Sequence, residues 1–238
     1  MSPRIVGIVG GLGPESTIDY YRRLIERWQR LEPGSSPAIV IDSLDVQRAL
    51  RLVEHDREGL AAYLLGSLRR LAGAGADFAA MTANTPHVVF DELASRSAIP
   101  LVSIVETCAD EAVRLQLRRP ALLGTRFTME GAFYPAVFAR RGITVITPDD
   151  AGRALVHDRY IGELLKGEFK DATRDVIVRL IGRMIEREKV DGVILGGTEL
   201  PLLLPGAIIE GIPVLDTTAL HVDAIVAQLR ADPGSRRR

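Results

Sequence analysis

Hydrophobic residues along this chain form short runs typical of buried strands, and these runs alternate with segments of helical periodicity. Strands are predicted at 4–9, 38–44, 78–81, 99–105, 121–124, 143–147, 193–195 and 212–215. Helices are predicted at 15–30, 56–74, 107–117, 130–140, 160–165, 171–189 and 218–229, where apolar residues recur every three or four positions. This alternation predicts an α/β fold whose parallel sheets are covered on both faces.

The pattern occurs twice in the chain. Four pairs of landmarks lie 113 or 114 positions apart: Gly10 and Gly124, Asp77 and Asp191, Ala83 and Gly197, and Pro100 and Pro213. We therefore predict two pseudo-symmetric parallel-sheet α/β domains that face each other across one ligand cleft. The first domain is expected to comprise residues 1–117 together with 214–238, and the second residues 118–213.

Composition narrows the range of partners. The 238 residues are 47% hydrophobic and 26% charged, as in ordinary globular proteins, and a formal net charge of −1 gives no electrostatic reason to expect nucleic acid or an anionic membrane as a partner. No apolar run is long enough to span a bilayer. A strand is predicted within a few residues of Met1, so no secretory signal is expected. Residues 232–238 are expected to be a frayed tail.

The only cysteine, Cys108, excludes an intramolecular disulfide framework and a cysteine metal cluster, and it indicates a cytoplasmic protein. Because Cys108 falls in the middle of a predicted helix, buried packing is its expected role. No metal site is expected.

The glycine turn at 10–13 follows the first strand and precedes the first helix. Backbone N–H groups at such a junction can face an anion, so Gly11 is expected to help hold a carboxylate or phosphate. A Rossmann dinucleotide site is disfavoured, because Ser16 stands where a third glycine or alanine belongs and no acidic residue ends a second strand at the usual spacing. The plain alternative is a βα turn without a ligand.

Small hydroxylated and amide residues follow the predicted strands in both halves of the chain: Asn84, Thr85, Thr125, Thr128 and Thr198. Ligands of α/β proteins lie beyond the carboxyl ends of the strands, and such groups bind carboxylates without a full counter-charge. The alternative is that each residue only caps the helix that follows. Their matching positions in the two halves favour a ligand site, and the two roles are compatible.

Taken together, several segments resemble the aspartate/glutamate racemase family over nearly the whole chain: 10–15, 84–87, 122–129, 195–200 and 213–217. The resemblance implies a protein with two pseudo-symmetric α/β domains that uses no cofactor, commonly pairs as a homodimer and binds a small amino acid or carboxylate between its domains. It also implies that Asn84, Thr85, Thr125 and Thr198 hold the carboxylate of the ligand.

The same resemblance reveals a departure from the family. Its members move the Cα proton with two thiols, one before the Asn-Thr pair and one before the Thr-Glu pair. Those positions are Ala83 and Gly197 in this chain, and neither side chain can carry a proton. Cys108 lies on a predicted helix away from both strand ends and is not expected to substitute.

The remaining candidates for acid–base chemistry are Asp45, Glu199 and His87, with Glu15 and Thr82 as weaker ones. A carboxylate in a partly desolvated cleft can act as a general base. Asp45 has an equally good structural interpretation as a helix cap or as a partner of Arg48.

Three functions remain open. The first is a thiol-independent isomerase or lyase that acts on an amino dicarboxylic acid or related carboxylate. The second is a catalytically inactive homologue that binds a small carboxylate or regulates another process. The third is a different reaction, such as elimination or decarboxylation, in which one face of the substrate needs no base.

Overall fold

The computed structural model of the chain describes residues 4–206 and 208–231. The expected tail at 232–238 lies outside the described residues. Contacts divide the chain into two compact units. The first unit comprises Met1–Thr82, Val89–Ser103 and His221–Arg238, and the second comprises Ala83–Val88 and Ile104–Leu220. The second unit contains 83–88, 104–117 and 214–220, which the expected domains place in the first; the strand at 212–216 pairs within the second sheet.

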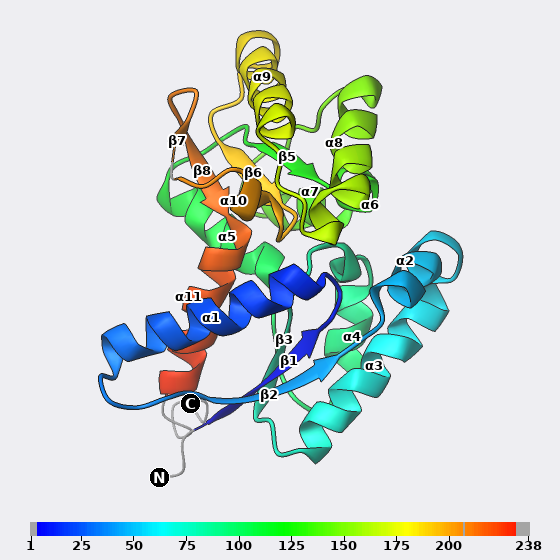
Figure 1. The fold of residues 1–238 in the computed structure, drawn as a ribbon, viewed down its shortest axis with the longest axis vertical. Coiled ribbons are helices and arrows are strands. Elements are labelled where there is room, and N and C mark those ends of the chain that lie inside the picture. The colour runs from blue at the N-terminus through cyan, green and yellow to red at the C-terminus, as the bar shows by residue number, and fades with distance from the viewer. Residues whose placement is uncertain (1–3, 207, 232–238) are drawn as a thin grey trace. The chain divides into compact units, whose positions relative to one another are not determined.

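The first unit is built on a four-stranded parallel sheet in the order β2-β1-β3-β4, of which β2, β1 and β3 are labelled in Figure 1. Its strands are β1 (Ile5–Gly10), β2 (Ala38–Ser43), β3 (Phe78–Met81) and β4 (Leu101–Val102). Its helices are α1 (Pro14–Leu31), α2 (Val46–His55), α3 (Arg57–Gly73), α4 (Phe90–Arg96) and the part of α11 (Thr217–Arg230) from His221 onward.

Alternating residues of β1 supply both faces of this sheet. Val6 and Ile8 are buried against α1 and α11, in a cluster that includes Tyr20 and Val222. Gly7 lies on the opposite face, where an added Cβ would be 3.0 Å from the Leu71 Cβ of α3. The absence of a side chain at this position therefore lets α3 pack closely on the sheet.

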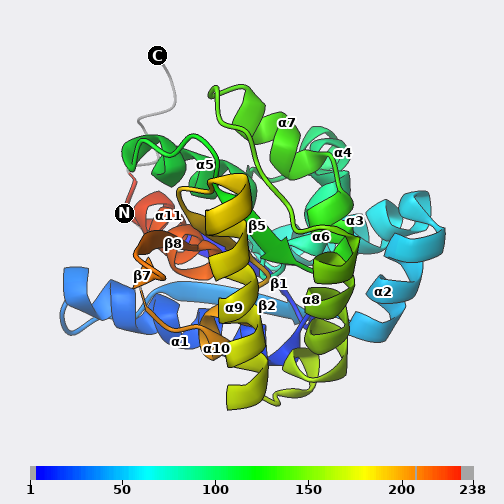
Figure 2. The ribbon, with the colours of Figure 1, turned by 90° about the horizontal axis from the view of Figure 1, so that it is seen from above.

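The second unit contains another four-stranded sheet, in the order β5-β6-β8-β7. Figure 2 shows its strands β5, β8 and β7 from above. Its strands are β5 (Ala121–Gly124), β6 (Val193–Gly196), β7 (Ile208–Ile209) and β8 (Ile212–Asp216). The helices of this unit are α5 (Ile104–Arg114), α6 (Arg126–Glu130), α7 (Phe133–Ala139), α8 (Asp150–Gly162), α9 (Asp171–Glu188) and α10 (Leu200–Leu203), with the 3-10 turns η1 (Thr85–Val89) and η2 (Leu164–Lys166).

The two sheets repeat one arrangement of strands. The order β1-β3-β4 in the first corresponds to β5-β6-β8 in the second. The aspartates that precede β3 and β6 also make equivalent hydrogen bonds to backbone N–H groups. The Asp77 carboxylate accepts from the Ile5 backbone N–H at 2.7 Å, and that of Asp191 accepts from the N–H groups of Arg118 and Arg119 at 2.6 and 2.9 Å. Each aspartate thus ties the start of its own strand to the start of the neighbouring strand.

Several predicted elements differ from the structure. The strand expected at 143–147 is a single bridge from Ile146 to Ala121, and β7 pairs antiparallel with β8. Helix α8 begins at Asp150 and not at 160, because the Asp149 side chain caps it by accepting from the Gly152 N–H. The sequence interpretation missed α2, although Asp45 caps it in the same manner. No helix among the described residues is both long and apolar enough to cross a membrane.

A buried histidine links three elements of the first unit. The Nε2–H of His221 donates to the Val102 carbonyl at 3.0 Å, and its Nδ1 accepts from the Tyr20 hydroxyl at 2.9 Å. Burial of the ring lowers the pKa of His221 to about 4, and the bond to Val102 offsets only part of that effect. This pKa lies below that of an unfolded histidine. The contribution of His221 to the free energy of unfolding is therefore present above pH 6.5 and is lost as the pH falls toward 4.

Candidate functional site

The carboxyl ends of β5, β6 and β8 form one edge of the second sheet, and the predicted site residues of the second unit lie near this edge. Gly124 at the end of β5 is in register with Gly196 at the end of β6. Residues 83–88 belong to this same unit, although β3, which precedes them in sequence, belongs to the first unit. The structure thus brings Asn84 and Thr85 together with the strand ends of the second half of the chain.

Three threonine hydroxyls meet at this edge. The Oγ1 of Thr85 is 2.9 Å from that of Thr125 and 3.3 Å from that of Thr128, and the last two are 3.3 Å apart. We call Thr85, Thr125 and Thr128 the hydroxyl cluster. Thr125 also caps α6, since its Oγ1 accepts from the Thr128 N–H. Capping and membership of the cluster therefore coexist in one residue.

Asn84 is buried and held at both ends of its amide. Its Oδ1 accepts from the Tyr134 hydroxyl at 2.6 Å, and its Nδ2 donates to the Thr217 Oγ1 at 3.2 Å. Thr217 in turn donates to the Leu195 carbonyl of β6 at 2.8 Å. An amide fixed in this way presents its second N–H hydrogen in one direction, which suits an orienting contact to a ligand.

Glu199 and Tyr160 form a buried pair after β6. Glu199 is 1% exposed and Tyr160 is 4% exposed, and the Tyr160 hydroxyl donates to the Glu199 carboxylate. The Thr198 hydroxyl donates to the same carboxylate oxygen at 3.2 Å. Burial raises the pKa of Tyr160 well above its ordinary value, and the charge of Glu199 raises it further.

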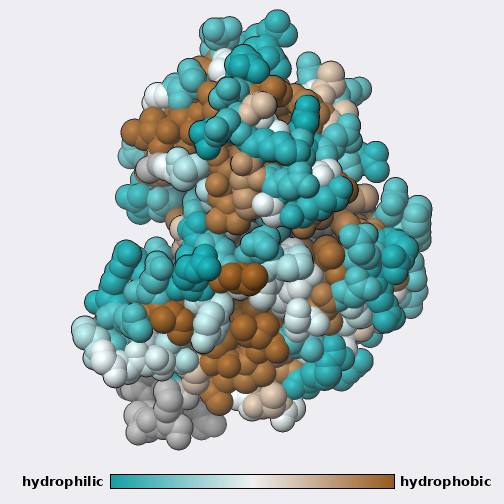
Figure 3. Space-filling model, in the orientation of Figure 1, coloured by the Kyte–Doolittle hydropathy of each residue, from teal (hydrophilic) through white to brown (hydrophobic). Residues whose placement is uncertain are grey.

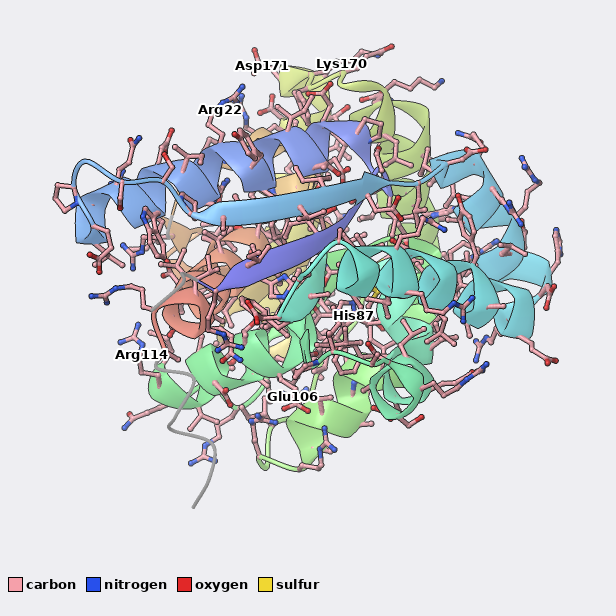
Figure 4. All side chains as sticks on the ribbon, turned by 90° about the horizontal axis from the view of Figure 1, so that it is seen from below. Arg22, His87, Glu106, Arg114, Lys170 and Asp171 are labelled. Atoms are coloured by element: carbon pink, nitrogen blue, oxygen red, sulfur yellow. The ribbon has the colours of Figure 1, made fainter. Side chains whose placement is uncertain are left out.

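His87 lies inside the molecule, in contrast to Arg114 at the periphery (Figure 4). Its Nε2 accepts from the Ile104 backbone N–H at 3.3 Å, which leaves Nδ1–H to donate to the Ala83 carbonyl at 3.1 Å. With both ring nitrogens engaged by the backbone, His87 fixes the conformation of residues 83–87.

The other predicted site residues belong to the first unit. Asp45 is exposed and caps α2, with its Oδ1 accepting from the Gln47 N–H at 2.8 Å, in agreement with the capping interpretation. The Gly11 N–H, expected to face an anion, donates instead to the Thr17 Oγ1 at 2.9 Å. Gly11 has φ +75°, and an added Cβ would be 2.2 Å from the Leu44 carbonyl oxygen, so close packing accounts for this glycine.

The weaker acid–base candidates also lie in the first unit. Glu15 is exposed in the first turn of α1. Thr82 is buried, and its hydroxyl donates to the Val9 carbonyl at 3.3 Å.

Cys108 is buried in α5, as expected for a packing residue. Burial raises the pKa of its thiol well above the ordinary value, and the charges of Glu111 and Asp216 add to that effect. A thiol in this environment is held in the protonated form, which is a poor nucleophile and a poor base.

Sequence reasoning missed Tyr134, Tyr160 and Thr217. Tyr134 and Tyr160 lie on helices that read as ordinary amphipathic segments, and their hydroxyls reach partners 50 and 39 positions away. Thr217 follows a strand end, so the rule that selected Thr125 and Thr198 also applied to it. No local sequence pattern predicts the contacts of Tyr134 and Tyr160.

Comparisons with known proteins agree with this architecture. The family model of the Asp/Glu/hydantoin racemases matches residues 9–225. The chain is 28% identical over 228 residues to the broad specificity amino-acid racemase RacX of Bacillus subtilis (strain 168), covering 94% of this chain and 97% of that protein.

Solved structures also resemble the chain over nearly its full length. The crystal structure of a proposed Asp/Glu racemase from Yersinia pestis matches with a TM-score of 0.84 and 34% identity, covering 95% of this chain and 99% of the other. An aspartate racemase homologue from Pyrococcus horikoshii OT3 matches with a TM-score of 0.80 and 33% identity, covering 96% and 100%. Because the family model matches residues 9–225 and these relatives cover nearly the whole chain, the chain belongs to the Asp/Glu/hydantoin racemase family.

Proposed function

We propose that this protein is a cofactor-independent isomerase or lyase that acts at the Cα–H bond of an amino dicarboxylic acid or a related small carboxylate. The hydroxyl cluster beside the fixed Asn84 amide is the observation that carries this proposal. Threonine hydroxyls can turn their hydrogens toward a carboxylate, and the remaining N–H of Asn84 supplies a further donor. Such a group of donors holds an anionic ligand without requiring a buried counter-charge.

We further propose that the reaction proceeds without thiols. Positions 83 and 197, which correspond by resemblance to the thiols of the family, hold Ala83 and Gly197, and Cys108 is buried with a raised thiol pKa. Proton transfer then falls to a carboxylate, with Glu199 and Asp45 as the candidates. Asp45→Asn separates capping from catalysis, since asparagine caps a helix as well as aspartate does.

Independence from pyridoxal phosphate is supported by the lysines. Pyridoxal phosphate enzymes hold the cofactor as a Schiff base on a lysine within the site. The three lysines of this chain, Lys166, Lys170 and Lys189, are all exposed. Racemisation or exchange that persists after treatment with hydroxylamine, which strips the cofactor, would agree with this proposal, and its abolition would contradict it.

Incubation with each enantiomer of aspartate and glutamate in deuterated water tests the proposed reaction. Deuterium incorporation at Cα, followed by NMR, is the expected result, with chiral chromatography to separate racemisation from exchange with retention. Ligand-induced thermal stabilisation without any exchange would instead favour an inactive homologue that binds a small carboxylate. Ala83 and Gly197 in place of thiols are the observation that favours this second candidate.

We also propose that the chain forms a homodimer through α1 and β2. Figure 3 shows hydrophobic surface over these elements of the first unit, and Ile18, Tyr21 and Ile41 are 50%, 50% and 41% exposed. β2 lies at the edge of its sheet, where the backbone can pair with a strand of a second copy of the chain. Light scattering after gel filtration is expected to give the mass of a dimer, and Ile41→Lys to give a monomer. A monomeric parent protein would refute the proposal.

A further inference from the structure

Two buried titratable side chains that are not part of the hydroxyl cluster are in contact just beyond the carboxyl end of β6. Tyr160 reaches this place from α8, and Glu199 stands at the start of the four-residue α10. Burying a carboxylate is costly unless hydrogen bonds compensate for lost water, and here the Tyr160 and Thr198 hydroxyls both donate to it. A pair of this kind in a fold that positions ligands at strand ends is typical of a functional site.

The Tyr160 ring occupies the place that a side chain on residue 197 would take. A Cβ added to Gly197 would be 2.3 Å from the Tyr160 Cε2 and 2.9 Å from its hydroxyl oxygen. Gly197 is therefore required for this placement of the ring. The phenol hydroxyl consequently stands where a side chain at the end of β6 would otherwise present its functional group.

The pair and the hydroxyl cluster occupy the same edge of the second sheet. Thr128 of the cluster packs beside the last residues of both β5 and β6: its Cβ is 3.1 Å from a Cβ added to Gly124, and its Cγ2 is 3.3 Å from one added to Gly196. Gly197 follows Gly196 directly. The hydroxyl cluster and the Tyr160 hydroxyl thus both lie at the carboxyl ends of β5 and β6, where a ligand held by the cluster would be bound.

We propose that Tyr160 and Glu199 act as one proton-transfer pair on one face of the substrate, an inference that rests on the function proposed above. The Cα–H bond breaks and its electrons stay on the substrate, while the proton goes to the Tyr160 oxygen. The phenol proton passes at the same time to the Glu199 carboxylate, so the phenol stays neutral and Glu199 becomes protonated. Return of a proton follows the same path in reverse.

Relay through a neutral phenol is consistent with the electrostatics of the pair. Burial and the neighbouring Glu199 charge raise the pKa of Tyr160, so the phenol is protonated at rest and phenolate is not the base. Glu199 alone would need to reach the substrate directly, yet it is 1% exposed and its Oε2 accepts from both Tyr160 and Thr198. The relay lets this carboxylate act through the hydroxyl that it holds.

The test uses Tyr160→Phe, which removes the hydroxyl but keeps the ring beside Gly197. Since general acid–base groups contribute about 10²- to 10⁴-fold, kcat for exchange of the Cα hydrogen of the active amino acid is expected to fall about 100-fold or more, with KM within about threefold. Glu199→Gln is expected to lower kcat similarly, and the double variant to lose no more than the stronger single one, because both residues serve one transfer.

Tyr20→Phe is the matched control, because Tyr20 is a buried tyrosine of the first unit whose hydroxyl also has a buried partner, His221. It is expected to leave kcat unchanged. Unchanged kcat in Tyr160→Phe, or a loss confined to KM, would overturn the inference, and so would multiplicative losses in the double variant. If Tyr160→Phe does not fold, Glu199→Gln decides by the same criterion. A parent protein that exchanges no Cα hydrogen would overturn the proposed function, and this inference with it.

Discussion

Gly197 offers a direct test of how tightly Tyr160 is packed at the end of β6. Replacing it with alanine adds one methyl group, whose carbon would lie 2.3 Å from the Tyr160 Cε2 in the present structure. Real carbon atoms do not approach so closely, so the ring must move. Tyr160 is 4% exposed and belongs to a buried cluster with Leu195 and Leu200, which leaves it little room.

Overpacking of this kind typically costs about 1–3 kcal/mol of unfolding free energy. For a protein of this size each kcal/mol corresponds to about 2–4 °C, so Gly197→Ala is expected to lower Tm by about 2–12 °C. Urea denaturation followed by circular dichroism measures the free energy, and differential scanning fluorimetry measures Tm. Gly197→Cys is expected to be at least as destabilising, so adding thiols at positions 83 and 197 should not by itself create a working thiol site.

Gly182→Ala is the matched control, because nothing lies within 4 Å of a Cβ added at this glycine of α9. It is expected to be neutral or to stabilise by up to about 1 kcal/mol through helix propensity. In a Tyr160→Leu background, the penalty of Gly197→Ala should shrink by about 1 kcal/mol or more, as expected for residues in contact. An equal penalty in both backgrounds would refute the assignment of the clash to Tyr160.

Three further predictions concern other contacts. Wild-type protein should lose about 2 kcal/mol of stability between pH 7 and pH 5 from His221 alone, so denaturation curves of His221→Gln should show less pH dependence; equal slopes would contradict the lowered pKa of about 4. Tyr134→Phe should raise KM about tenfold by freeing the Asn84 amide, measured by initial rates, and an unchanged KM would exclude an orienting role. Asp191→Ala should lower the unfolding free energy by about 1 kcal/mol, with Asp191→Asn intermediate, and equal stability of all three proteins would argue against its backbone contacts.

The fold class and the internal repeat can be predicted from the amino-acid sequence alone. Buried runs that alternate with amphipathic segments specify parallel strands and covering helices, because each period of the pattern selects one element. Asp77 and Asp191 occupy matching positions in the two halves of the sequence, and they make equivalent hydrogen bonds at the starts of β3 and β6. The threonines after the strands were also predictable, because the carboxyl ends of neighbouring parallel strands meet at one edge.

Tertiary structure decided which of the candidates share a site. The sequence does not reveal that Asp45 caps α2 with its Oδ1 or that His87 binds backbone groups at both ring nitrogens. Tyr160 lies 37 positions before Gly197 on a helix of ordinary amphipathic pattern, and only the packing of α8 against β6 brings its ring to that glycine. Local sequence records the pattern that folds each element, whereas a contact between distant side chains depends on how those elements pack.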